Sequence, residues 1–420
     1  MNREQLTEVI KDQMTMRWKE SYIPRNAFSR IDSLKTISSV IIISGVRRCG
    51  KSTFLQQIRN SETKQDYYMN FDDERLINFS VEDFQKLYEL FIEMYGEQQV
   101  FYFDEIQNIP GWERFVRRLH DQGNKLYITG SYASMLSREL GTHLTGRFVQ
   151  IELYPFSFGE YLLNKKISHD IKFLGTKDKA VYKRNFNDYF VSGGIPEYIQ
   201  SYERKYLKTM YESILYRDIV ARYKITRDHE LKELVYFCAS NVSKEISYNS
   251  LKKIIGVNSQ TTVKDYLSYL ENAYLLFLLP RYDYSVKRQI LAPKKIYIID
   301  NALALQLGTR NSPDQGRLLE NLVFIQLKRS EQEIYYYSGK RECDFVIKEG
   351  NRIIHAIQVT LSLENEETSQ REINGLIEAM KTYGLATGLI LTEDEEDEIT
   401  VNTYKITILP VWKWLLQNWK

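Results

Sequence analysis

A run of β-branched residues that leads into a glycine-bounded loop and then a helical pattern constrains this chain more than any other feature. The run is Val40–Ile43, glycines stand at Gly45 and Gly50, and Lys51 begins the helical pattern, so the stretch reads VIIISGVRRCGKSTFLQQI. A continuous apolar run is typical of a strand buried on both faces of a parallel sheet. Glycine leaves no Cβ in the way, so the backbone N–H groups of such a loop can curl around a phosphate. The spacing G-x-x-x-x-G-K-S between a strand and a helix therefore predicts a phosphate-binding loop.

The side chains around the second glycine have the chemistry that a bound nucleoside triphosphate requires. We expect Lys51 to contact the β- and γ-phosphates and the Ser52 hydroxyl to ligate Mg²⁺. The start of the helix adds unpaired N–H donors and the positive end of the helix dipole. The residues predicted to surround the nucleotide are Gly45, Arg48, Cys49, Gly50, Lys51, Ser52 and Thr53. Phosphate binding alone does not explain Arg47 and Arg48, for which contacts with nucleotide, DNA or a neighbouring domain stay open as alternatives.

An acidic pair follows a later apolar strand pattern. This strand is predicted at Gln99–Ile106 (QVFYFDEI), and Asp104 and Glu105 stand near its end. Downstream of a phosphate-binding loop, such an Asp helps to hold Mg²⁺ through its water shell and such a Glu polarises the attacking water. Acidic residues are also common where a strand passes into a loop. The order of the two motifs, rather than the pair itself, therefore predicts a hydrolytic site.

Two later residues are candidates for contacts with the γ-phosphate. Ser131 follows the predicted strand Lys125–Thr129 (KLYIT), and we expect it either to act as a sensor that orients the water or to cap a helix. Arg147 precedes the predicted strand Phe148–Leu153, and it is either an arginine finger or a surface residue. The repeated strand–helix order predicts a parallel sheet that binds its ligand at the carboxyl ends of the strands.

The chain resembles a known family in four stretches: GVRRCGKST, FYFDEIQNIPGWE, ITGSYASML and LTGRFVQIELYPFSFGEYL. They are similar to motifs of a family of bacterial and archaeal AAA-type P-loop ATPases that carry a C-terminal domain of unassigned function, DUF4143. The resemblance runs from about Ile23 to about Leu391. It implies an α/β fold with an AAA-like parallel-sheet core, a helical lid, a winged helix and a restriction-endonuclease-like terminal domain. It also implies ATP rather than GTP as the nucleotide.

Length and composition bound the organisation of the chain. Its 420 residues exceed what one hydrophobic core usually holds, so several domains are expected. We predict the AAA-like core at 1–155, the helical lid at 156–230, the winged helix at 231–312 and the nuclease-like domain at 313–420. The net charge of +2 neither favours nor excludes a nucleic-acid partner. The apolar runs are too short for a membrane span, Met1–Lys19 is unlike a signal peptide, and the three cysteines are scattered, so we expect a cytoplasmic protein without a membrane partner.

The segment 232–279 has the pattern of a helix–turn–helix. Gly256 marks the turn between the predicted helices Ser250–Ile255 and Ser259–Ala273, and Ser259 is expected to cap the second helix. Strands at 275–279 and 295–299 would complete a two-stranded wing. The residues that would face bases or phosphates from the second helix are Gln260, Thr261, Thr262 and Lys264. Acidic side chains share this helix, and such modules also contact proteins, so a DNA partner, a protein client and a packing role stay alternatives.

The last part of the chain, from Gly316, resembles the frame of PD-(D/E)xK nucleases. Those enzymes carry an acid, any residue and a lysine on their third strand, where this chain has Gln358 and Thr360. An amide is a poor Mg²⁺ ligand and threonine carries no positive charge, so we predict a degenerate domain that serves in binding or docking. Nuclease activity stays an alternative. In that case Glu320, Glu342 and Asp344 would hold the metal, and Lys340 or Lys348 would supply a displaced cation.

Together these patterns predict an ATPase that binds and hydrolyses Mg-ATP and couples its nucleotide state to the C-terminal domains. One alternative is an ATP-gated module that binds DNA or protein with little turnover. Another is a nuclease with a non-standard site. The client, the pathway and the oligomeric state, a homo-oligomer included, do not follow from the sequence.

Overall fold

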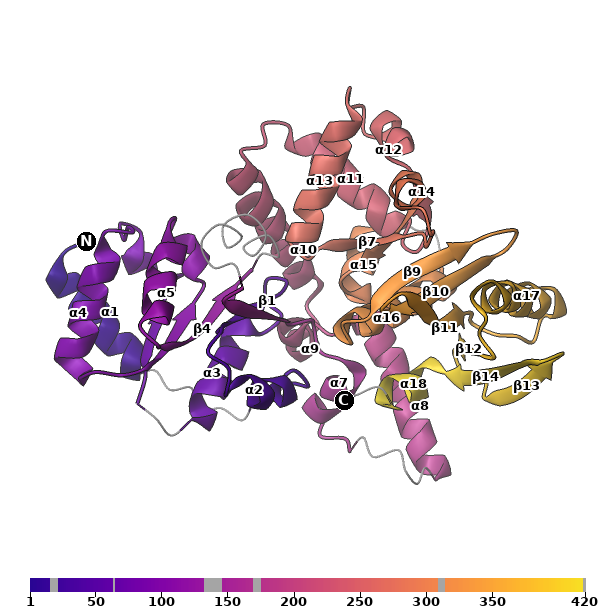
Figure 1. Cartoon of the computed structure of the whole chain (residues 1–420), viewed down its shortest axis with the longest axis horizontal. Helices are drawn as coiled ribbons and strands as arrows, with labels where there is room; N and C mark the ends of the chain where they lie inside the picture. Colours follow the sequence, from indigo (N-terminus) through magenta and orange to yellow (C-terminus); the bar gives the residue numbers. More distant parts are fainter. Residues whose placement is uncertain (16–21, 63–64, 132–145, 169–174, 309–313, 418–420) are drawn as a thin grey trace. The chain divides into compact units, whose positions relative to one another are not determined.

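The structure, a computed structural model, describes residues 1–15, 22–62, 65–131, 146–168, 175–308 and 314–417 (Figure 1). The chain divides into two compact units, Met1–Tyr154 and Pro155–Lys420. Among the described helices, none combines the length and the apolar character that crossing a membrane requires.

The first unit is built on a five-stranded sheet in the order β2-β3-β4-β1-β5, and each pairing between neighbours is parallel. The strands are β1 (Val40–Ser44), β2 (Tyr67–Asn70), β3 (Val100–Asp104), β4 (Lys125–Gly130) and β5 (Phe148–Glu152). Strand β4 lies between the strand that precedes the glycine loop and the strand that ends in the acidic pair. The parallel-sheet core predicted from the sequence is therefore confirmed, and the carboxyl ends of β1, β3 and β4 meet at one edge.

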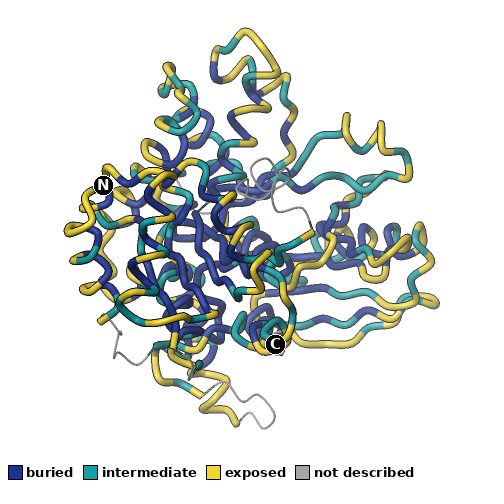
Figure 2. Tube along the Cα trace, turned by 60° about the vertical axis from the view of Figure 1, so that its left-hand side comes forward, coloured by how far each residue is buried: buried dark blue, intermediate teal, exposed yellow. Residues whose placement is uncertain are grey.

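Helices cover both faces of this sheet, which explains the continuous apolar run in β1. They are α1 (Arg3–Thr15), α2 (Phe28–Leu34), α3 (Lys51–Ser61), α4 (Asp83–Tyr95) and α5 (Trp112–Asp121), with short 3₁₀ turns at Glu74–Leu76 and Ile106–Asn108. Val40 and Ile42 join a core with apolar residues of α1, α4 and α5, such as Leu87 and Val116. Helix α3 packs against β1, β3 and β4. Strands β1 and β3 are accordingly buried along their length, whereas the edge strand β5 is half-buried except at Ile151. Figure 2 shows buried stretches of the chain as a dark blue tube.

The second unit begins with helices. They are α7 (Phe158–Asn164), α8 (Thr176–Ser192), α9 (Pro196–Ser201) and α10 (Arg204–Ser213), followed by a π-helical segment at Ile214–Ala221. The glycine pair between α8 and α9 is a packed turn. Gly193 has φ +63°, and Gly194 donates its N–H to Asp300 (2.6 Å) while its carbonyl accepts the N–H of Phe156 (2.6 Å). A Cβ on Gly194 would lie 2.1 Å from the Phe156 oxygen, so this position requires glycine for close backbone approach.

A helix–turn–helix with a small sheet follows. Its elements are α11 (Asp228–Ser240), β6 (Glu245–Ile246), α12 (Tyr248–Ile254), α13 (Gln260–Asn272), β7 (Leu276–Pro280), α14 (Val286–Leu291), β8 (Lys294–Ile298) and α15 (Asn301–Leu307). The Ser259 hydroxyl accepts the N–H of Thr261 at 3.0 Å and so caps α13, as expected. The predicted two-stranded wing has a third strand, because β6 pairs antiparallel with β8. This short strand carries too few residues to be recognised from its pattern.

A six-stranded mixed sheet ends the chain, in the order β13-β14-β12-β11-β10-β9. Its elements are α16 (Gln315–Arg329), β9 (Glu333–Ser338), β10 (Glu342–Glu349), β11 (Arg352–Val359), α17 (Glu366–Tyr383), β12 (Thr387–Thr392), β13 (Asp397–Val401), β14 (Tyr404–Pro410) and α18 (Val411–Gln417). Helix α16 is buried continuously from Leu318 to Leu327, Glu320 and Asn321 included, which directs attention to the polar groups around it.

Candidate functional site

The glycine loop joins β1 to α3 in the conformation that its sequence predicts. Gly45 and Gly50 have φ angles of +152° and +96°. A Cβ on Gly45 would lie 2.1 Å from the backbone oxygen of Leu153, so only glycine fits there. Arg48 also has positive φ, +66°, and its side chain is exposed, whereas Cys49 is fully buried. Burial raises the pKa of the Cys49 thiol, so this cysteine packs the loop and is not a reactive thiolate.

Lys51 extends back along the loop toward the acidic pair. Its side chain is 4% exposed, and its Nζ donates to the carbonyls of Gly45 (3.2 Å) and Val46 (3.3 Å). The same Nζ lies 3.6 Å from Oε1 of Glu105. The ammonium group and the carboxylate assigned to water activation thus share one small space at the carboxyl edge of the sheet.

Thr129 organises the acidic pair. Its hydroxyl donates to Oδ1 of Asp104 (2.5 Å) and accepts the backbone N–H of Glu105 (2.8 Å). Glu105 has φ +51°, a left-handed conformation that is costly for a residue with a Cβ and that this hydrogen bond helps to hold. Sequence reasoning did not single out Thr129. The feature that could have marked Thr129 is a hydroxyl side chain near the carboxyl end of an otherwise apolar strand.

Ser131 and Gln107 hold the other end of the Glu105 side chain. The Ser131 hydroxyl lies 3.0 Å from both carboxylate oxygens of Glu105, and the Gln107 amide donates to Oε2. Ser131 therefore contacts the acid itself. Ser134 also has a side chain that could cap a helix here, but it lies outside the described residues.

The environment separates the pKa values of the two acids. Burial, reinforced by the charge of Glu105, raises the pKa of Asp104 to about 6, although hydrogen bonds from Thr129 and Ser52 and the charge of Lys51 oppose this shift. Burial also acts on Glu105, but the charge of Lys51 and the hydrogen bond from Gln107 outweigh it and lower its pKa below the ordinary value. Glu105 is thus the acid that stays ionised, as a group that accepts hydrogen bonds from a nucleophile must be.

The residues at this edge suit a divalent cation. Mg²⁺ prefers hard oxygen ligands, and the Ser52 hydroxyl lies close enough to the Asp104 carboxylate to act against the rise of its pKa. A hydroxyl and a carboxylate that lie near each other can both face one ion. The donor set therefore fits the magnesium that the sequence predicts.

Arg25 supports the loop from the N-terminal segment. Its buried guanidinium donates to the carbonyls of Cys49 (2.8 Å) and Tyr154 (2.5 Å). Gly50 lies directly beside it, since a Cβ there would be 3.3 Å from Nη1 of Arg25. Nothing in the spacing of the sequence marks this arginine, because its partners are 24 and 129 residues away.

Arg147 does not belong to this site, and its prediction as a γ-phosphate contact within the same site is wrong. Its carbonyl accepts the N–H of Val40, the first residue of β1, and Phe148 pairs with Val40 in parallel register. Arg147 therefore lies at the amino edge of the sheet, about 13 Å along β1 from the loop. Its Nε is 3.5 Å from Asp121 at the end of α5.

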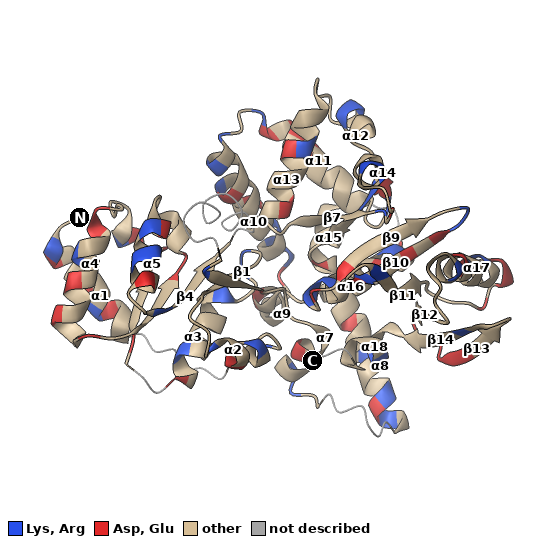
Figure 3. Cartoon of the chain, in the orientation of Figure 1, with Lys and Arg blue, Asp and Glu red and all other residues tan. Residues whose placement is uncertain are grey.

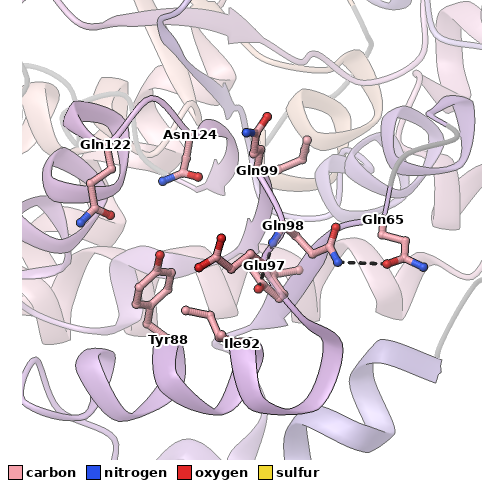
Figure 4. Close-up of a pocket in the computed structure, with 10 residues that line it drawn as sticks. Gln65, Tyr88, Ile92, Glu97, Gln98, Gln99, Gln122 and Asn124 are labelled. Atoms are coloured by element: carbon pink, nitrogen blue, oxygen red, sulfur yellow. Dashed lines mark hydrogen bonds between the residues drawn. The ribbon is translucent and has the colours of Figure 1, made fainter.

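The same amino edge carries a hollow of about 620 Å³ (Figure 4). Its lining is largely amide and aromatic: Gln65, Tyr67, Tyr88, Ile92, Glu97, Gln98, Gln99, Val100, Gln122 and Asn124. Gln98 spans part of it by donating to Gln65 at 3.0 Å. Its described lining residues include no lysine or arginine. The hollow lies at the edge of the sheet opposite the glycine loop that precedes Lys51.

In the second unit, the residues predicted to face DNA lie at the start of α13. Gln260, Thr261 and Lys264 are exposed, and Thr262 is half-buried. The Nζ of Lys264 lies 5.2 Å from the ring centre of Tyr248 on α12. These side chains are therefore available on the surface of the helix–turn–helix.

The carboxylates of the nuclease-like sheet meet a lysine that sequence reasoning did not consider. Glu320 and Asp344 both contact Lys295 of β8. Of the two predicted sources of a displaced cation, Lys348 pairs with Glu333 at 2.8 Å instead. Lys340, whose backbone N–H donates to Glu378 on α17, stays a prediction. Lys295 escaped notice because it precedes the nuclease-like segment and belongs to the wing.

Three family models match consecutive parts of the chain. An AAA domain covers residues 38–162, a domain of unknown function (DUF8612) covers residues 183–314, and a domain of unknown function (DUF4143) covers residues 315–414. The helix–turn–helix thus lies within the DUF8612 match and outside the DUF4143 match.

Two relatives match nearly the whole chain. The "Uncharacterized protein MJ1544" of Methanocaldococcus jannaschii is 35% identical over 97% of this chain and 94% of its own length. An "Uncharacterized protein" of Haemophilus influenzae is 30% identical over 93% of this chain and 98% of its own length.

Two solved structures are among those similar to this chain. One is the Walker-type ATPase PABY2304 of Pyrococcus abyssi, with 14% identity, 69% of this chain and 97% of that chain covered, and a TM-score of 0.45. The other is the Aeropyrum pernix ORC1 protein in complex with DNA. It is 13% identical, the match covers 73% of this chain and 95% of that chain, and the TM-score is 0.31.

Proposed function

Since this chain belongs to the family of AAA-domain proteins with a C-terminal DUF4143 domain, we propose that it binds Mg-ATP and hydrolyses it at the edge where β1, β3 and β4 end. The observation that carries the proposal is the opposed behaviour of two adjacent acids beside one lysine. Asp104 is buried with a raised pKa and contacts Ser52, whereas Glu105 is kept ionised next to Lys51. Separated pKa values within a pair are typical of groups with different catalytic roles.

Each side chain then has one role. The N–H groups of the loop and Lys51 hold the phosphates, Lys51 exchanging its carbonyl partners for phosphate oxygens. Ser52 and Asp104 hold Mg²⁺, which neutralises charge on the β- and γ-phosphates when bound. Glu105 accepts a hydrogen bond from the attacking water and polarises it. Ser131 and Thr129 position Glu105, and Arg25 positions the loop.

Phosphate release from the purified full chain tests this assignment. Glu105→Gln keeps the size of the side chain but removes its basicity, so we expect release to fall about 10²–10⁴-fold while ATP binding persists. Lys51→Ala is expected to weaken ATP binding itself. Glu97→Gln makes the same chemical change at an exposed position on the amino edge and serves as the control. Normal release from Glu105→Gln would overturn the proposal.

A second candidate function is binding to duplex DNA through the helix–turn–helix, gated by ATP. It is favoured by exposed cations on its outer surface. Lys253 of α12 and Lys264 of α13 are exposed, and Figure 3 shows further Lys and Arg on α12 and α14. Cations that neutralise phosphates release counterions, so binding through them falls steeply with salt.

The salt dependence of binding separates this candidate from a protein-contact role. We expect Lys253→Ala and Lys264→Ala each to reduce the slope of log K against log[salt] by about 1 for duplex DNA. Lys381→Ala, on exposed α17, should leave the slope unchanged. Absence of binding at low salt, with and without ATP, would remove the candidate and leave a protein client.

We also propose that the nucleotide state acts on four functional parts: the core at 1–155, a helical lid at 156–230, a winged helix at 231–312 and a nuclease-like domain at 313–420. The π-helical segment Ile214–Ala221 in the lid is of a kind that often occurs at functional positions. Size measurement with and without a non-hydrolysable ATP analogue tests whether the cycle also changes oligomeric state.

A further inference from the structure

Three acidic side chains of the C-terminal sheet domain converge on one buried ammonium group. The Nζ of Lys295 lies 3.1 Å from Oε1 of Glu320 and 2.9 Å from Oδ1 of Asp344, and it also pairs with Glu342. The Lys295 side chain is 3% exposed. These three acids are the candidate metal ligands of the nuclease-like segment, so the ammonium group lies where a metal ion bound by them would lie.

The remaining polar groups of the site are already engaged with the protein. Oε1 of Glu320 accepts the Tyr297 hydroxyl at 2.6 Å, and Oδ2 of Asp344 accepts the N–H of Val359 at 3.0 Å. Gln358 donates to Glu372 (2.5 Å), and its side-chain oxygen accepts the N–H of Asp344 (3.3 Å). Among the described residues, no group of three or more acids, histidines or cysteines is arranged to hold a metal ion. The residues therefore do not fit the magnesium that this fold implies.

Electrostatics favours the lysine as a permanent occupant. Carboxylates buried without a partner are costly, and an ammonium group has three donors that match three acceptors. Burial acts to lower the pKa of Lys295, but the charges of Asp344 and Glu320 outweigh it and raise the pKa well above its usual range. Lys295 is thus charged at neutral pH.

The lysine reaches the cluster from the wing, so the cluster spans two segments of the chain. Lys295 and Tyr297 belong to β8, whereas the acids belong to α16 and β10. Further contacts tie the same elements together. Asn321 of α16 binds both backbone groups of Ile298, at 2.8 and 2.9 Å, and the Tyr297 ring stacks on Phe324 with 4.0 Å between ring centres.

We propose that Lys295 is the resident cation of a former metal site, and that its ammonium group closes this domain to metal-dependent hydrolysis and joins the wing rigidly to the C-terminal sheet. The nuclease-like fold then serves as a rigid connection between the wing and the C-terminal sheet. Movement of the wing is transmitted to the sheet because β8 cannot leave α16 without exposing unpaired buried charge.

Mn²⁺ binding to the nucleotide-free full chain, measured by electron paramagnetic resonance, tests the proposal. Lys295→Met removes the ammonium and keeps an apolar chain of similar length. We expect this variant to gain one Mn²⁺ site at least tenfold tighter than any in the wild type, and Lys295→Met/Asp344→Asn to lose it. The single variant Asp344→Asn, which keeps Lys295, should bind Mn²⁺ as the wild type does. A wild-type site that depends on Asp344, DNA cleavage that depends on it, or no gain in Lys295→Met would each overturn the proposal.

Folding of the variants is followed in parallel, because Lys295→Met leaves buried carboxylates without a partner. If it folds only when Mn²⁺ is supplied, the ion has replaced the ammonium and the proposal is supported. The triple variant Lys295→Met/Glu320→Gln/Asp344→Asn removes the charges together and is expected to fold without Mn²⁺. If the triple variant folds and Lys295→Met fails with and without Mn²⁺, the cluster is no cation site and the proposal is wrong.

Discussion

Thr129→Val is the most informative single change in the first unit, because it removes one hydroxyl and keeps the shape of the side chain. Thr129 is fully buried and serves both acids, as donor to Asp104 and acceptor from the Glu105 backbone. Valine would leave the carboxylate with one fewer donor and the Glu105 N–H without its acceptor. Both groups lie at a strand end where water is excluded on the sheet side.

The expected cost follows from these two hydrogen bonds. A hydrogen bond to a charged group contributes about 1.5–3 kcal/mol, and an unsatisfied buried donor costs about 1–3 kcal/mol. Partial rearrangement of Glu105, which already has a strained φ of +51°, lowers the sum, so we expect a loss of about 3 kcal/mol in the stability of the first unit. Mispositioning of the base should reduce turnover by about 10–100-fold, since 1.4 kcal/mol of barrier corresponds to tenfold in rate.

Two measurements check this prediction. Thermal unfolding should show the transition of the first unit lowered by about 6–12 °C, at 2–4 °C for each kcal/mol in a unit of this size. Phosphate release should fall while ATP binding stays close to that of the wild type. Thr129→Ser retains the hydroxyl and should recover most of both properties. Wild-type turnover and melting in Thr129→Val would show that the hydroxyl does not organise the acidic pair.

Three further predictions concern other parts of the chain. Arg147→Ala should leave phosphate release unchanged, since Arg147 lies at the amino edge of the sheet, and a loss beyond about tenfold would mean that it acts as a finger on another copy of the chain. Gly194→Ala should cost the second unit about 3 kcal/mol or more in thermal unfolding, because its Cβ would lie 2.1 Å from the Phe156 oxygen, while ATP binding persists; normal melting would refute the close approach. Burial and the charge of Asp344 raise the pKa of Glu320 above its ordinary value of 4.5, so the folded state binds this proton more tightly than the unfolded state, and the stability that the proton contributes is full below pH 4.5 and declines as pH rises above it. Glu320→Gln keeps an acceptor for Tyr297 and should flatten this decline between pH 5 and 8; equal slopes in both proteins would contradict it.

Much of the nucleotide site could be predicted from the sequence because its chemistry is local. The loop between Gly45 and Gly50 is defined by spacing within a few residues, and its conformation depends on the glycines themselves. Asp104 and Glu105 were recognisable because they stand near the carboxyl end of a predicted strand. The carboxyl ends of parallel strands form the ligand-binding edge of the sheet.

The prediction for Arg147 failed for a reason that the sequence already contained. In a parallel sheet, a residue that precedes a strand lies at the amino edge, opposite the loop that follows β1. Arg25 and Thr129 were missed for the opposite reason. Their roles depend on partners brought close only by the fold, 129 residues away in the case of Arg25 and Tyr154.

The C-terminal half shows the same division most clearly. The sequence by itself determined that Gln358 and Thr360 stand where the nuclease motif has an acid and a lysine, and this predicts a degenerate frame. Only the tertiary structure decided which cation meets the remaining acids, because Lys295 enters from β8, a strand of another segment. Side-chain chemistry and short-range spacing are properties of the sequence, whereas the meeting of charges from distant strands is set by sheet order and packing.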